Sequence, residues 1–194
     1  MRFSLSNIFN TLPETSALRC TIFLSLLSFA RSNDELELLS SSLTQLPTWL
    51  AQWQVSPEQR ESCLAAVAEA LNDAASAEAG GDLETQKKAY DFQLLYLRFL
   101  SAGGASFESK AKQTAEKIIA QAVSFPSIFD FESLLQIEAV AKLTQDQSSA
   151  VGGLLRILSG GSAKEYKEWI SKNQAEVKRL GACCRASMSL ISAC

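Results

Sequence analysis

The sequence contains no histidine, which removes the side chain that most often serves as a general base or a metal ligand. Cys-x-x-Cys pairs and the Gly-Lys-Ser/Thr end of a phosphate loop are absent too. A nucleophile needs a positioned base, so only lysine or carboxylate pairs remain for catalysis. The carboxylate pairs at Asp130/Glu132 and Glu165/Glu168 stand at expected helix starts, where capping explains them. We therefore expect no catalytic residues, no cofactor, no metal and no small-molecule substrate.

Neither positive nor negative charge is in large excess, since 18 basic and 21 acidic residues give a net charge of −3. This balance gives no general attraction to phosphates. Lys110, Lys112 and Lys117 form a small basic face without aromatic stacking platforms, which is typical of a solvated helix face. We expect no binding to DNA.

Long hydrophobic runs are scarce. The stretch from Cys20 to Ala30 is largely apolar and ends with small residues at the spacing of a secretory cleavage site. It is too short for a bilayer, which takes about 20 residues, and Glu14 lies where a leader would be basic. We interpret this stretch as a buried helix and expect no association with membranes.

The five cysteines are odd in number, and two of them, Cys183 and Cys184, are adjacent in the chain. Both features disfavour a disulfide framework. Reduced thiols predict a cytoplasmic protein. Cys20 and Cys63 are expected to be small buried hydrophobic residues.

Only 4 prolines and 9 glycines interrupt the chain, and apolar residues recur at three- and four-residue spacing. No alternating pattern predicts a strand. The expected helices cover residues 14–30, 34–46 with an end at Pro47, 57–79, 82–102, 106–124, 130–135, 137–143, 154–158 and a last one from 163.

The helix boundaries are strongly signalled. Ser56 to Gln59 and Ser162 to Glu165 are predicted capping boxes. The pairs Gly80-Gly81, Gly103-Gly104, Gly152-Gly153 and Gly160-Gly161 are predicted turns. Long helices joined by short turns lie antiparallel, and such hairpins bury their apolar faces by stacking. The sequence therefore predicts an all-α array of helical hairpins.

Five segments carry a family resemblance, namely NIFNTLP, LPTWLAQWQVSPEQR, YDFQLLYLRFL, FPSIFDFESLLQIEAVAKL and GLLRILSGGSAKEYKEWISKN. Together they resemble the PCI family, whose name refers to the proteasome lid, the COP9 signalosome and eukaryotic translation initiation factor 3. The resemblance spans roughly residues 3 to 181. Its most specific parts are residues 125–135 and 154–173.

The resemblance implies a right-handed superhelical array of antiparallel helical hairpins in residues 1–181. Family members normally continue into a winged helix, whereas residues 182–194 look like a divergent tail, so we expect a form truncated before that module. The implied function is a non-catalytic scaffold subunit that contacts other subunits of translation initiation factor 3 and, indirectly, the 40S ribosomal subunit. The segment from Trp49 to Trp53 favours this complex. The alternatives are a protein like subunit 7 of the COP9 signalosome and a stand-alone peptide-binding helical adaptor.

The candidate protein-interface residues are aromatic or large and apolar: Trp49, Trp53, Tyr166, Trp169 and Ile170. We expect the two tryptophans near residue 50 to be core or groove anchors. The other three are expected to form an exposed apolar end where the missing winged helix would pack.

Overall fold

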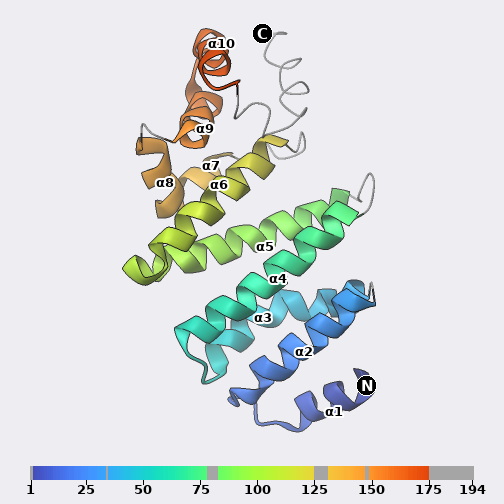
Figure 1. Ribbon diagram of the computed structural model, residues 1–194. Coiled ribbons are helices and arrows are strands. Elements are labelled where there is room, and N and C mark those ends of the chain that lie inside the picture. The colour runs from blue at the N-terminus through green and yellow to red at the C-terminus, as the bar shows by residue number, and fades with distance from the viewer. Residues whose placement is uncertain (1, 34, 78–82, 125–130, 147–148, 175–194) are drawn as a thin grey trace. The chain divides into compact units, whose positions relative to one another are not determined.

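The computed structural model describes residues 2–33, 35–77, 83–124, 131–146 and 149–174 (Figure 1). Within those ranges all regular structure is helical, which confirms the predicted all-α fold. The helices are α1 (Arg2–Thr11), α2 (Leu18–Ser32), η1 (Leu36–Leu39), α3 (Ser40–Gln52), α4 (Pro57–Ala77), α5 (Leu83–Ala102), η2 (Gly104–Phe107), α6 (Glu108–Ser124), α7 (Phe131–Leu135), α8 (Glu138–Gln145), α9 (Ala150–Gly160) and α10 (Ala163–Lys172).

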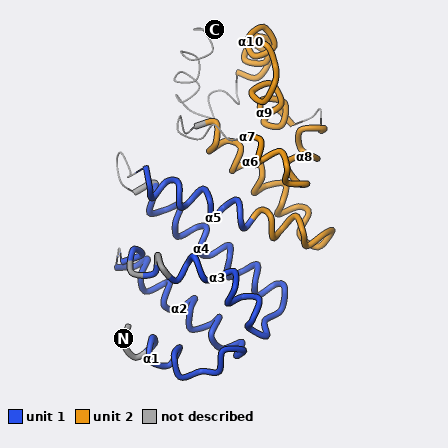
Figure 2. The backbone as a smooth tube through the Cα atoms, turned by 180° about the vertical axis from the view of Figure 1, so that it is seen from behind, with its two compact units in different colours: residues 1–96 blue, residues 97–194 orange. Residues whose placement is uncertain are grey.

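The chain divides into two compact units, residues 1–96 and residues 97–194 (Figure 2). Each unit has a core of its own. The expected boundary between a helical part and a tail at residue 181 lies outside the described residues and stays a prediction. The superhelical sense of the array also stays a prediction.

In the first unit, α2 is the central element and contacts α1, η1 and α4. Its buried face consists of Cys20, Phe23, Leu27 and Ala30, so the stretch that resembles a leader forms a packed helix. The helix begins at Leu18, four residues later than we expected from Glu14. Residues 13 to 16 close a turn instead, in which the Ser16 N–H donates to the Pro13 carbonyl at 3.0 Å.

The predicted helix end at Pro47 is wrong, because α3 continues through Pro47 to Gln52. Proline removes one backbone hydrogen bond from a helix interior. Leu46 and Leu50, only 0% and 4% exposed, flank Pro47 and bury the inner face of the helix on both sides of it. Burial of apolar side chains stabilises a helix more strongly than one backbone hydrogen bond does, so packing keeps the helix intact.

Both predicted capping boxes are confirmed. The Ser56 N–H donates to Gln59 Oε1 at 3.0 Å, and the Gln59 N–H donates to Ser56 Oγ at 3.2 Å. At α10, the Ser162 N–H donates to Glu165 Oε2 and the Glu165 N–H donates to Ser162 Oγ. The residues Gly80, Gly81 and Asp82, and the start signal at Asp130, lie outside the described residues.

Polar contacts join α4 to the part of α5 that lies in the first unit. The Tyr96 hydroxyl donates to Glu61 Oε1 at 2.7 Å, and Gln93 Nε2 donates to Asn72 Oδ1 at 3.2 Å. Burial raises the pKa of Tyr96 well above its usual range, and the hydrogen bond to the Glu61 carboxylate raises it further. Because buried polar groups need specific partners, these contacts fix how the two helices are aligned.

In the second unit, α9 contacts α6, α7, α8 and α10. The predicted turn at Gly152-Gly153 is wrong, because both glycines lie inside α9. Ser149 starts this helix, since its Oγ accepts from the Gly152 N–H at 3.1 Å. Gly152 also lies against the Leu143 backbone of α8, where a Cβ atom would overlap the carbonyl oxygen. Gly152 therefore permits a close approach of two helices. Gly104, in contrast, has a φ of +66° and follows α5 as predicted.

Cys20 and Cys63 are buried free thiols, 4% and 0% exposed, on α2 and α4. A hydrogen bond with Cys20, together with burial, raises the pKa of the Cys63 thiol. Only thiolates react quickly with alkylating reagents. We therefore expect Cys63 of the folded chain to react with iodoacetamide at least about tenfold more slowly than in the unfolded chain. Peptide mass spectrometry after timed labelling measures this, and equal rates in both states would contradict the described packing.

Candidate functional site

Four aromatic rings from α1, α2 and the C-terminal end of α3 form a cluster in the first unit. Trp49 stacks on Trp53 with ring centroids 6.0 Å apart and an interplanar angle of 26°. Phe9 of α1 lies 5.6 Å from Trp49, and Phe23 of α2 lies 6.4 Å from it. Trp53 is 1% exposed and belongs to the core, whereas Trp49 is half-buried. Trp49 therefore presents part of its indole to solvent from a rigid support.

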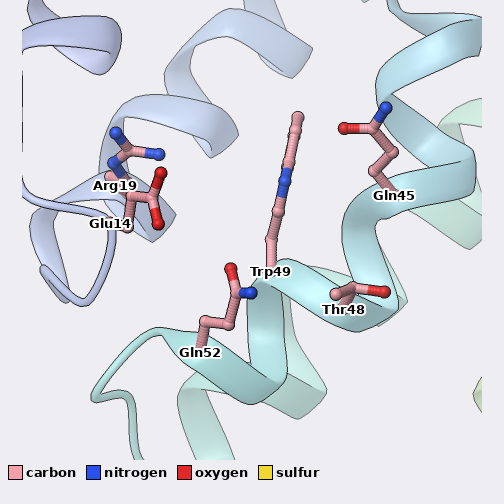
Figure 3. Close-up of a pocket in the computed structure, with 6 residues that line it drawn as sticks. All are labelled: Glu14, Arg19, Gln45, Thr48, Trp49 and Gln52. Carbon is pink, nitrogen blue, oxygen red and sulfur yellow. The ribbon is translucent and has the colours of Figure 1, made fainter.

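An open pocket of about 320 Å³ surrounds that exposed part of Trp49. Its wall comes from the turn before α2, the first turn of α2, and α3. Figure 3 shows the indole of Trp49 between Glu14 and Arg19 on one side and Gln45 on the other. The lining residues are Glu14, Arg19, Gln45, Thr48, Trp49 and Gln52.

Arg19 is held at the α1 side of the pocket. Its Nε and Nη2 both donate to the Leu12 carbonyl, at 3.2 and 2.7 Å. Its guanidinium carbon also lies 4.8 Å from the centre of the Phe9 ring, which is within the range of a cation–π interaction. These contacts keep the guanidinium against α1.

The remaining polar side chains of the pocket are open to a partner. The structure gives Glu14, Gln45, Thr48 and Gln52 no side-chain hydrogen bond or ion pair with the other described residues. All four are exposed. Each carries an oxygen that accepts hydrogen bonds, and Glu14 adds a negative charge. The pocket is thus an aromatic platform with acceptors around it.

The candidate residues in the second unit do not form the exposed end that we expected. Tyr166 is 5% exposed and Trp169 is 8% exposed, so that expectation is wrong for both. The indole N–H of Trp169 donates to the Ala150 carbonyl at 3.0 Å, and the ring edge lies beside Gly153. Their burial arises because α10 packs on α9. Ile170 is half-buried. A role of these residues in binding partners stays a prediction.

The five candidate residues are divided between the two units. Trp49 and Trp53 lie in the first unit, whereas Tyr166, Trp169 and Ile170 lie in the second. Sequence reasoning missed the polar residues of the pocket. The positions 45, 48, 49 and 52 follow the spacing of one helix face, a signal that could have shown three of them. Glu14 and Arg19 reach the pocket through tertiary packing, which no local pattern shows.

The described part of the chain lacks features of two other functional classes. It holds no group of three or more side chains that could bind a metal ion. None of its helices has both the length and the apolar character that crossing a bilayer requires. The pocket around Trp49 contains a single carboxylate and no nucleophile beyond a threonine hydroxyl.

Comparison with curated proteins gives matches over most of the chain. A protein of Aspergillus terreus named eukaryotic translation initiation factor 3 subunit M is 32% identical over 171 residues, which is 86% of this chain. The chain is a homologue of that subunit. Subunit M of Neosartorya fischeri is 31% identical over 176 residues, or 89% of this chain, and that of Coccidioides immitis is 30% identical over 170 residues.

The chain spans about a third of the length of these M subunits, 35% for Aspergillus terreus and 34% for Coccidioides immitis. No protein-family model matches the chain. The similarity to the initiation-factor subunit is therefore a similarity to individual M subunits. The all-α fold agrees with the family resemblance in the sequence.

Proposed function

We propose that this chain is a non-catalytic scaffold subunit of eukaryotic translation initiation factor 3. The observation that carries the proposal is the match to M subunits over 86% of the chain. In this function the chain contacts other subunits of the factor through its helical faces and supports recruitment to the 40S ribosomal subunit. A cytoplasmic location, where translation initiation takes place, is part of the proposal.

The architecture supports a role in protein–protein contacts. Helical hairpins that stack side by side expose extended faces, and such faces bind other proteins in many helical arrays. The described part presents one aromatic side chain, Trp49, in an open pocket with unpaired polar neighbours. Tryptophan is enriched at the residues that contribute most to protein interfaces. The PCI-type superhelix remains part of this proposal.

Co-purification from the organism's own cells tests the proposal. The tagged chain is expected to enrich subunits of translation initiation factor 3, and the enrichment should persist after ribonuclease treatment because protein contacts carry it. The 40S subunit is expected to be enriched without ribonuclease. Enrichment of COP9 signalosome subunits in place of the initiation factor would overturn the proposal, as would the enrichment of neither complex.

A further inference from the structure

We propose that the pocket around Trp49 binds an arginine side chain from an extended basic segment of a partner protein. The inference rests on the proposed function in one respect, namely that the partner is a protein. Its physical basis is the aromatic platform, the unpaired acceptors around it and the charge of the first unit.

The aromatic platform suits a planar cation. Phe9, Phe23 and Trp53 pack against Trp49 from within the unit and hold its ring in place. Ligand binding therefore costs little side-chain entropy at Trp49. A guanidinium group stacks on an indole through cation–π attraction and dispersion, and tryptophan is the best aromatic partner for a cation.

The acceptors match the donors of a guanidinium group. An arginine side chain carries five N–H donors and no acceptor. The pocket offers the carboxylate of Glu14, the amide oxygens of Gln45 and Gln52, and the hydroxyl of Thr48. Since these groups make no side-chain hydrogen bonds with other described residues, a ligand displaces only water. Arg19 is the one cation in the wall, and its two bonds to the Leu12 carbonyl keep it at the edge next to α1.

The charge of the whole unit has the required sign. Residues 1–96 contain 6 basic and 12 acidic residues, a net charge of −6. Residues 97–194 carry +3, because the whole chain has −3. A field of this sign increases the encounter rate of basic segments with the first unit and disfavours acidic ones. A basic segment therefore fits this unit better than a neutral or an acidic one.

The test uses the full chain and short Gly/Ser peptides that carry one central arginine, glutamine or glutamate. We expect the arginine peptide to shift the indole N–H resonance of Trp49 saturably, without a shift of Trp169, and to bind at least about threefold more tightly than the glutamine peptide. Three results would each overturn the proposal: equal binding of the three peptides, a shift of the Trp169 indole together with that of Trp49, or no binding of any peptide.

Charge variants locate the interaction. Glu14→Gln is expected to weaken binding of the arginine peptide about threefold, and Gln45→Glu to strengthen it about threefold, since each changes one charge at a partly exposed site. Glu37→Gln is the matched control, because Glu37 is exposed in the same unit and does not line the pocket. A gain of affinity in Gln45→Glu cannot arise from misfolding. If Glu37→Gln weakens binding as much as Glu14→Gln, the attraction is general and the pocket proposal is wrong.

The two proposals fail separately. Loss of arginine binding in vitro with initiation-factor subunits still co-purifying would overturn the pocket alone. Arginine binding that follows the charge variants, without those subunits in the purified complex, would overturn the scaffold function and leave the pocket standing.

Discussion

Replacing Gly152 by alanine is expected to destabilise the second unit by about 3 kcal/mol, enough to unfold a large fraction of it at moderate temperature. A Cβ atom at this position would overlap the Leu143 carbonyl oxygen and lie 2.8 Å from the Leu143 carbonyl carbon. The clash is with backbone, which cannot rotate aside as a side-chain end can. Relief requires α9 to move away from α8, and this movement opens the packing around the fully buried Leu154.

The next residue of the same helix provides the control. A Cβ atom on Gly153 would lie 3.6 Å from the indole nitrogen of Trp169, an ordinary van der Waals distance. Alanine is a better helix former than glycine, so Gly153→Ala is expected to stabilise the unit by about 0.5–1 kcal/mol. Hydrogen exchange followed by mass spectrometry over a denaturant series measures both variants in segments of the second unit. Opposite signs are expected, and equal effects of the two substitutions would contradict the described approach of α9 to α8.

Trp53→Ala is expected to lower the free energy of unfolding of the first unit by about 3–5 kcal/mol, as is usual when a large aromatic core residue is truncated. Trp53 is 1% exposed and contacts rings from α1, α2 and α3. Truncation leaves a cavity between these helices and removes the support of Trp49. Urea unfolding monitored by hydrogen exchange in segments of residues 2–77 gives the measurement.

Two variants check the cause of that loss. The indole nitrogen of Trp53 has no hydrogen-bond partner among the described residues. Trp53→Phe therefore removes an unpaired buried donor and keeps an aromatic ring, and we expect it to cost less than half as much as alanine does. Leu18→Ala is the surface control, since Leu18 is 61% exposed, and its effect should stay within about 0.5 kcal/mol. A phenylalanine variant as unstable as alanine would show that ring packing is not the cause.

Much of the fold follows from local signals in the sequence. Ser56 and Ser162 start helices because a side-chain oxygen and a following Glu or Gln are all that a capping box needs. The glycines after α5 end a helix because Gly104 adopts a positive φ, which glycine permits at little cost. These interactions lie within a few residues of one another, so the sequence alone predicts them.

The errors occur where contacts between distant segments decide the outcome. Pro47 is a helix breaker by propensity, but the buried neighbours Leu46 and Leu50 keep α3 continuous. Gly152 looks like a turn residue, but its lack of a side chain serves the approach of α9 to α8. Trp169 looks like an exposed anchor, but α10 packs it on α9. The pocket around Trp49 is of the same kind, because Glu14 and Arg19 reach it from a turn that no periodicity indicates.

The division of the three tryptophans between the units has a practical consequence. Trp49 and Trp53 stack at 6.0 Å in the first unit, while Trp169 lies alone in the second. Two indoles held this closely couple their electronic transitions, which produces a paired positive and negative band in the circular dichroism spectrum. Trp169 contributes no such pair. The sign and strength of that band therefore give an optical signal for the first unit alone, and Trp49→Phe should abolish it.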